Sequence, residues 1–282
     1  MISGILATIL MQPAGIFPFA APRIRPDGTQ DVVFVKDSRD KGTVLGKGSN
    51  VTQIPRQGGC VFASNELVPT VLAFDAGGQK LSEFARFGFK SVGRPAVVPS
   101  GNYAIAEFVG EFESEIWRFP LKGKGPATMI SSINKGDGTA NPAFEMDGRS
   151  TWVQMGGSWN LLNLSTSITE RIDVKPLFDG LPSGSIVTEV RPSHSIPKLV
   201  AVTVLLPGKE KLKWVMVWDR QTDRVSRLNP VGTSAESADW NRDGRFVIFN
   251  ATDTKSGRKT LQSANPSGGE PEVISVIKDA GQ

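Results

Sequence analysis

The sequence predicts an all-β fold: a six-bladed β-propeller of four-stranded antiparallel blades. Two sets of internal repeats and their spacing support this prediction. The first set has five gapless copies of a short strand, a tight turn and a second strand, at residues 22–28, 95–101, 142–148, 192–198 and 238–244. Each copy begins with Pro or Ala, has a bulky residue two positions later, and is followed by an alternating apolar run. Such hairpin signals at regular intervals indicate a repeated β unit.

The second set consists of apolar runs that end in a small polar turn, and it predicts a third and a fourth strand in each unit. These runs cover residues 71–78, 116–123, 159–165, 215–222 and 261–268. Both sets recur at one or two units of roughly 40 to 50 residues, the length of a four-stranded propeller blade.

Six units account for nearly all of the chain. They begin near residues 22, 55, 95, 142, 192 and 238. The second unit has no Asp-Gly turn and is placed by Gly58-Gly59 and by the later turn at Asp75. We therefore expect one propeller over 22–282, preceded at 1–21 by an apolar arm or closing strand, or by the remnant of a signal peptide.

The repeats resemble the TolB-type propeller repeat, whose usual form is Pro, an aromatic residue, and Ser-Pro-Asp-Gly followed by a basic residue. Residues 142–149 and 238–245 fit this form best, whereas 192–198 has lost the Asp-Gly pair. The resemblance implies a propeller fold. It also suggests an extracytoplasmic setting, the bacterial periplasm, and a place in a larger envelope or membrane-associated assembly. Propellers host binding, scaffolding and catalysis alike, so the function stays open.

The composition fits a compact domain and argues against some classes of protein. The 282 residues are 39% hydrophobic and 21% charged, and 30 Gly and 19 Pro suit many short turns. No apolar stretch is long enough to span a membrane. The net charge of +4 is dispersed over many loops instead of forming a basic stripe, so nucleic acid is not an expected partner.

The sequence predicts no catalytic residues, no cofactor and no metal site. His194, the only histidine, stands at the bulky position of its repeat and is expected to pack between blades. Cys60 lies in an apolar run and is expected to be a buried thiol. Residues 239–244 match the opening of a calcium loop, but Asn250 replaces the Glu at loop position twelve, so a repeat turn explains them better. Most of the six tryptophans should fill the gaps between blades.

One repeat position suggests a binding site at the mouth of the central channel. Arg94, Asn141 and Arg191 align just before the innermost strands, together with Ala21 and Ser237. Two arginines and an asparagine that converge there can receive a carboxylate or an acidic peptide. The alternative is that they form hydrogen bonds with carbonyls of neighbouring loops.

We expect a non-catalytic propeller that binds another protein or protein complex, as an accessory or scaffold subunit. Rigid blades would present the variable loops 109–114, 207–213 and 253–259. Candidate docking residues in these loops are Lys209, Lys211 and Lys255. The alternatives are a propeller hydrolase or lyase, or a carbohydrate-binding propeller, acting at the central channel.

Overall fold

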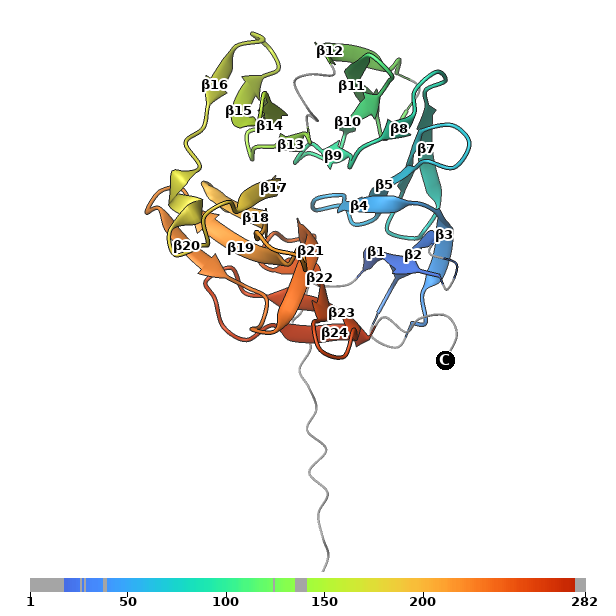
Figure 1. Cartoon of the computed structure of the whole chain (residues 1–282). Helices are drawn as coiled ribbons and strands as arrows, with labels where there is room; N and C mark the ends of the chain where they lie inside the picture. The colour runs from blue at the N-terminus through green and yellow to red at the C-terminus, as the bar shows by residue number, and fades with distance from the viewer. Residues whose placement is uncertain are drawn as a thin grey trace, which may run out of the picture.

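The computed structural model describes residues 18–276, except 26, 28, 38–39, 124 and 135–140. Six antiparallel sheets are arranged as blades around a central axis (Figure 1). The prediction of an all-β, six-bladed propeller is confirmed. Of the predicted N-terminal arm, residues 1–17 lie outside the described residues.

Each blade is formed by consecutive strands. Blade one contains β1 (Phe19–Ile24), β2 (Gln30–Val35) and β3 (Thr43–Lys47). Blade two contains β4 (Ser49–Gln53), β5 (Cys60–Ser64), β6 (Thr70–Phe74) and β7 (Lys80–Ala85). Blade three contains β8 (Ser91–Val92), β9 (Ala96–Val97), β10 (Tyr103–Val109), β11 (Glu113–Pro120) and β12 (Thr128–Asn134).

The remaining blades each have four strands. Blade four contains β13 (Ala143–Phe144), β14 (Ser150–Met155), β15 (Ser158–Asn163) and β16 (Thr169–Arg171). The short 3-10 helix η2 (Lys175–Phe178) leads to blade five: β17 (Ile186–Pro192), β18 (Leu199–Leu205), β19 (Lys213–Asp219) and β20 (Arg224–Arg227). Blade six contains β21 (Thr233–Trp240), β22 (Val247–Asp253), β23 (Lys259–Ala264) and β24 (Glu272–Val276).

The second strands of the blades are almost continuously buried. Val200, Ala201, Val202 and Val204 of β18 have no exposed surface, because neighbouring blades cover both faces of the strand. A strand covered on both faces is apolar throughout instead of alternating. The outermost strand β16 is exposed along its whole length.

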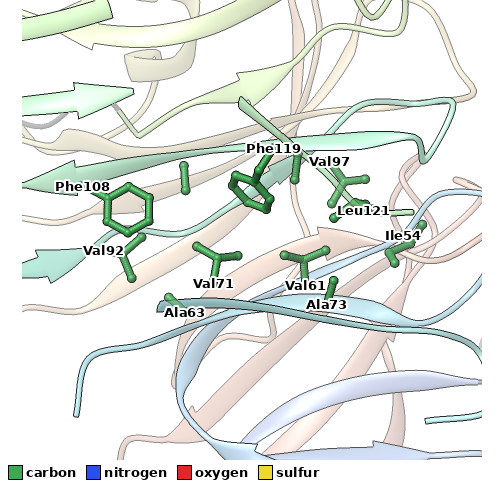
Figure 2. Close-up of a cluster of buried hydrophobic side chains, with 12 residues drawn as sticks. Ile54, Val61, Ala63, Val71, Ala73, Val92, Val97, Phe108, Phe119 and Leu121 are labelled. Carbon is green, nitrogen blue, oxygen red and sulfur yellow. The ribbon is translucent and has the colours of Figure 1, made fainter. Parts of the chain in front are cut away.

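Apolar side chains from adjacent blades form the core. Figure 2 shows the cluster between blades two and three, where Val61 and Val71 face Phe108 and Phe119. Clusters of the same kind join blade one to blades two and six. Such interdigitating packing is the main source of stability in a propeller, because each blade alone leaves two apolar faces exposed.

The tryptophans fill the gaps between blades, as predicted. Trp152 and Trp159 of blade four pack edge-to-face at 6.3 Å between ring centroids, and Trp152 packs in the same way on Trp218 of blade five at 6.5 Å. Trp240 is 2% exposed, and its indole N–H donates a hydrogen bond of 2.7 Å to the carbonyl of Arg191 in blade five. The rings thus give both burial and directional contacts.

The repeat turns have the expected chemistry. In the turn after β13, the carboxylate of Asp147 accepts hydrogen bonds from the N–H groups of Arg149 and Ser150. In the equivalent turn after β21, the Asn241 amide oxygen accepts two N–H groups in the same manner. Gly244 has φ +68°, and a Cβ there would lie 2.0 Å from the hydroxyl of Ser195. Glycine is therefore required by both conformation and space.

Blade one differs from the prediction in the direction of its strands. In blades two and six the first strand ends at a turn. In blade two this turn follows β4 and contains Gly58. A Cβ atom on Gly58 would lie 3.6 Å from the ring of Pro18, the residue before β1. The strand β1 therefore starts on the face where first strands end. Only Gly48 separates β3 from β4, so β3 leads into the next blade as a fourth strand does. The three strands β1, β2 and β3 thus take the places of a second, third and fourth strand.

The alignment of residues 22–28 with the other four repeats was accordingly wrong. The hairpin between β1 and β2 connects a second and a third strand, and Ala21 is not equivalent to Arg94 or Arg191. The physical reason is that a Pro- and Asp-Gly-containing turn closes any antiparallel hairpin. Its residues do not indicate which hairpin of the blade it closes.

The inner edge of β1 is protected against pairing with another strand. The Gln53 side chain from blade two donates a hydrogen bond of 2.8 Å to the carbonyl of Ala20 and accepts one of 3.3 Å from its N–H. Pro22 lies two residues after Ala20, so its main chain faces the same edge of β1. Proline has no N–H group to donate there. Both features are typical of a strand that remains an edge.

Candidate functional site

A cavity of about 640 Å³ opens at one end of the central axis. It lies on the face where the first strands begin, which we call the cavity face. Its lining is mainly amide and hydroxyl side chains, among them Ser49, Asn50, Asn141, Thr188, Ser237 and Asn250. Among the described residues that line it, none is aromatic, a histidine or a cysteine.

The width of the cavity follows from the composition of blade one. No described strand occupies the innermost position of that blade. Pro22 of β1 and Lys47 of β3 line the cavity on this side, and Asn250 and Lys259 of the neighbouring blade six also line it. The cavity is therefore the mouth of the channel, enlarged toward the inner edge of β1.

Three non-glycine residues of the lining have left-handed backbone conformations. Asn50 has φ 55°, Asn141 has φ 42° and Ser237 has φ 59°. Asn50 and Ser237 lie in bulges of β4 and β21, where the pairing with the second strand shifts register. Bulges re-aim side chains, and asparagine tolerates the left-handed region better than most residues. These bulges explain how the inner strands β4 and β21 present polar groups to the cavity.

Ion pairs between neighbouring segments border the cavity. Lys47 pairs with Glu66 at 3.0 Å, and Lys213 pairs with Glu236 at 2.7 Å. The lining also contains Lys259, for which no ion pair is seen among the described residues. The lining thus has neutral polar groups, two lysine–glutamate pairs, the additional cation Lys259, and Glu189, which pairs with Arg94.

Below the cavity lies Arg94, whose side chain is 5% exposed. Its guanidinium donates hydrogen bonds of 2.8 and 3.1 Å to the carbonyl of Val51 in blade two and one of 2.9 Å to that of Ala238 in blade six. It also pairs with Glu189 of blade five at 3.6 Å and with Asp239 of blade six at 3.4 Å. One side chain from blade three therefore ties three other blades together.

A second buried arginine completes this cluster. Arg191 is 6% exposed and donates a hydrogen bond of 3.2 Å to the carbonyl of Pro142 in blade four. Burial, and then the charge of Arg94, lower the pKa of Arg191 to about 10. Burial disfavours the charged form of Glu189, but Arg94 and Arg191 outweigh it and lower the pKa of that carboxyl. Two cations and two anions thus balance one another in the middle of the channel.

This cluster divides the channel. Glu189 lines the large cavity on one side, whereas Arg191 and Asp239 line a cavity of about 40 Å³ on the other. The cluster therefore lies between the large cavity and the small one.

The three residues predicted at the channel mouth occupy different depths. Arg94 and Arg191 are buried below the cavity and bind main-chain carbonyls, the contacts of the alternative interpretation. Asn141 lines the cavity, with its N–H 3.4 Å from a carboxylate oxygen of Glu107. Neither arginine lines the large cavity, and binding of a carboxylate by these residues stays a prediction.

The predicted docking loops lie on the cavity face. Each of them joins a second strand to a third: β10 to β11, β18 to β19, and β22 to β23. Lys209, Lys211 and Lys255 are all exposed in these loops. Sequence reasoning missed Glu189 and the cavity lysines Lys47, Lys213 and Lys259. The residues beside them in the cavity come from other segments of the chain, so the spacing of residues in the sequence did not indicate that they belong to one site.

The remaining candidates for chemistry are buried away from the cavity. Cys60 has no exposed surface, and burial raises the pKa of its thiol beyond the ordinary range, so the prediction of a buried thiol is confirmed. His194 is 8% exposed, and its Nε2–H donates a hydrogen bond of 3.0 Å to the carbonyl of Arg242 in the next blade. Its predicted role as a packing residue between blades is confirmed.

Two further findings concern only the described part of the chain. Its histidine, cysteine and acidic side chains form no group of three that is placed to hold a metal ion. None of its helices is both long and apolar enough to cross a membrane.

His194 predicts a pH dependence of stability. Burial lowers the pKa of its imidazole in the folded protein, although the hydrogen bond to Arg242 opposes this. The unfolded chain therefore binds a proton more readily, and the free energy of unfolding should fall as pH decreases below about 6.5. Urea unfolding at pH 7.5 and 5.5 measures the difference in the free energy of unfolding between the two pH values. His194→Gln should reduce this difference. Equal pH dependence in both proteins would contradict the prediction.

Comparison with known proteins supports the fold assignment. The structure is similar to TolB from Acinetobacter baumannii, with a TM-score of 0.63 and 16% identity over 90% of this chain and 64% of that chain. The chain has the TolB-type propeller fold. A putative TolB from Agrobacterium tumefaciens matches with a TM-score of 0.55 and 11% identity, over 83% of this chain and 84% of that chain.

Peptidase propellers are also similar. A puromycin-hydrolysing peptidase from Mycobacterium tuberculosis matches with a TM-score of 0.52 and 14% identity, over 92% of this chain but 44% of that chain. This chain thus spans less than two thirds of the Acinetobacter TolB and less than half of the peptidase. No protein-family model and no curated protein matches the sequence. The likeness to these TolB-type and peptidase propellers therefore concerns the fold.

Proposed function

We propose that this protein is a non-catalytic, protein-binding propeller that receives a partner at its cavity face, as an accessory or scaffold subunit of a larger assembly. The observation that carries the proposal is the polar cavity of about 640 Å³ on the same face as the exposed loops. A rigid ring that presents variable loops around a recess is suited to binding.

The lining favours a segment of polypeptide as the occupant. Amide and hydroxyl side chains such as Asn50, Asn250 and Thr188 can both donate and accept hydrogen bonds, which matches main-chain N–H and C=O groups. Lys259 adds a positive charge that suits a carboxylate on the inserted segment. A carbohydrate is less favoured, because sugars commonly stack on aromatic rings and no described residue of the lining is aromatic.

The enzyme alternative has less support. His194 and Cys60 do not line the cavity. Its carboxylates Glu66 and Glu236 are each paired with a lysine, and Glu189 is paired with Arg94. The similar peptidase is more than twice as long as the matched region. By analogy with the TolB proteins, we propose an extracytoplasmic bacterial setting, the periplasm.

Amine-reactive crosslinking followed by mass spectrometry on the protein isolated gently from its native cells tests this proposal. We expect one stoichiometric partner crosslinked to Lys209, Lys211 and Lys255. Lys122 and Lys198 are internal controls, because they lie exposed in turns of the opposite face. Their crosslinks to the partner should be absent.

Two outcomes would contradict the proposal. One is a protein that is recovered alone and monomeric, without crosslinks to another chain. The other is a partner attached through Lys122 and Lys198, which would place the docking surface on the opposite face.

A further inference from the structure

Three polar side chains of blade six stand together on the side of the cavity that faces blade one. Leu261 of β23 belongs to one apolar cluster with Phe19 of β1. Asn250 is the cross-strand partner of Leu261, so the two side chains lie on the same face of the sheet. Thr252 follows on that face, and Lys259 is its cross-strand partner. Asn250, Thr252 and Lys259 all line the cavity, and we call them the polar trio.

The polar trio offers hydrogen-bond donors to the cavity. The ammonium of Lys259 forms no ion pair with a described residue. The Oδ1 atom of Asn250 is buried without a hydrogen bond, so the end of this side chain that is accessible from the cavity is its NH2 group. Thr252 adds a hydroxyl. The trio therefore combines one positive charge with two neutral donors.

The carboxylates beside the polar trio in blade six have other partners. Glu236 is the cross-strand partner of Asn250 on β21, but it pairs with Lys213 at 2.7 Å. Asp253 accepts hydrogen bonds from two N–H groups of its own turn. Neither carboxylate is paired with Lys259.

The other charges around the cavity balance one another. Glu66 of the lining pairs with Lys47 at 3.0 Å, and Glu189 belongs to the buried cluster of two arginines and two carboxylates. Asp31 of blade one is bound by Arg25 at 2.7 Å and by Arg23 at 3.5 Å. Lys259 therefore adds one positive charge to the lining that the described lining residues do not neutralise.

A carboxylate fits the polar trio in charge and in hydrogen bonding. It carries one negative charge, which matches the one ammonium. Its two oxygens can accept the hydrogen bonds that an ammonium, an amide NH2 and a hydroxyl donate. A phosphate group carries almost two negative charges at neutral pH, so one of them would stay uncompensated.

We propose that the polar trio binds the carboxyl-terminal carboxylate of the polypeptide that enters the cavity. β22 and β23 are second and third strands, so the trio lies about 5–10 Å further from the axis than the first strands. A chain end reaches this off-axis position with one length of polypeptide, whereas an internal segment has to enter and return. Capture of a chain terminus is one of the recurring modes of peptide recognition.

This inference rests on the proposed function, and its test separates the two. The purified full chain is mixed with a library of random hexapeptides that have a free carboxyl terminus, or with the same library amidated at that terminus. Retained peptides are isolated by size exclusion and quantified by mass spectrometry. We expect about tenfold or more retention of the free-acid library over the amidated library, because amidation removes the charge that Lys259 binds.

Variants assign the effect to the polar trio. Lys259→Met should lower retention of the free-acid library to that of the amidated library, and Asn250→Leu should lower it a few-fold. Lys175→Met is the control and should leave retention unchanged, because Lys175 is 89% exposed and lies outside the cavity lining. The comparison of the two libraries uses the unaltered protein, so it does not depend on the folding of any variant.

Four results would overturn the inference. Equal retention of the two libraries would do so and leave the proposed function intact, because the cavity would then bind polypeptide regardless of its end. Enrichment of Asp- or Glu-containing peptides from the amidated library, lost in Lys259→Met, would assign the trio to a side-chain carboxylate. Unchanged retention in Lys259→Met would place the carboxylate elsewhere. Retention of neither library would also remove the inference, and the proposed function would then depend on the crosslinking result alone.

Discussion

Arg94→Ala should destabilise the protein by about 3–5 kcal/mol, because it removes one of the two cations that balance the partly buried carboxylates of Glu189 and Asp239. The carbonyls of Val51 and Ala238 also lose their donor. For a protein of this size, the loss corresponds to a fall in melting temperature of roughly 10 °C. Differential scanning calorimetry of the variant and the parent measures the effect.

Two further variants identify its cause. Arg149→Ala removes an exposed arginine from a repeat turn and should change stability by less than about 0.5 kcal/mol. Adding Glu189→Gln and Asp239→Asn to Arg94→Ala should recover part of the loss, because the stranded charges disappear. A stability equal to the parent in Arg94→Ala would show that the arginine does not hold the blades together.

Trp152→Ala should cost about 3–5 kcal/mol, the range for loss of a fully buried tryptophan. The ring has no exposed surface and packs between blades four and five against Trp159 and Trp218. Its indole N–H also donates a hydrogen bond of 2.7 Å to Glu145. Equilibrium unfolding in urea, followed by far-ultraviolet circular dichroism, gives the difference.

Trp152→Phe keeps an aromatic ring in the gap and should cost less than the alanine variant. Phe112→Ala, in which an 82% exposed ring is removed, should leave the free energy of unfolding nearly unchanged. If the buried and the exposed substitution had similar effects, packing between blades would not be the main source of stability.

Much of the fold could be predicted because its signals are local. The turns at 142–148 and 238–244 and the apolar runs that follow them predict hairpins from neighbouring residues alone. Repetition then gives the number of blades. The burial of His194 and Trp240 followed from their positions in the repeat, and that of Cys60 from the apolar run around it.

The candidate site was predicted less well, because it depends on contacts between distant segments. Repeat position placed Arg94 near the channel but did not show that its side chain reaches Ala238, which is 144 residues away in sequence. The pair formed by Lys213 and Glu236 likewise joins two blades. A repeat pattern in the sequence predicts where in its blade a residue lies. The residues that a long side chain contacts depend instead on how the closed ring places the other blades.

The sequence by itself determined the strand content, the number of blades and the interior position of the main packing residues, since periodicity and turn chemistry act over a few residues. Only the tertiary structure decided the direction of β1 and the width of the cavity, because a hairpin has the same local signals in either half of a blade. It also decided the closure of the channel. Arg94, Arg191, Glu189 and Asp239 come from three blades and meet only when the ring is complete.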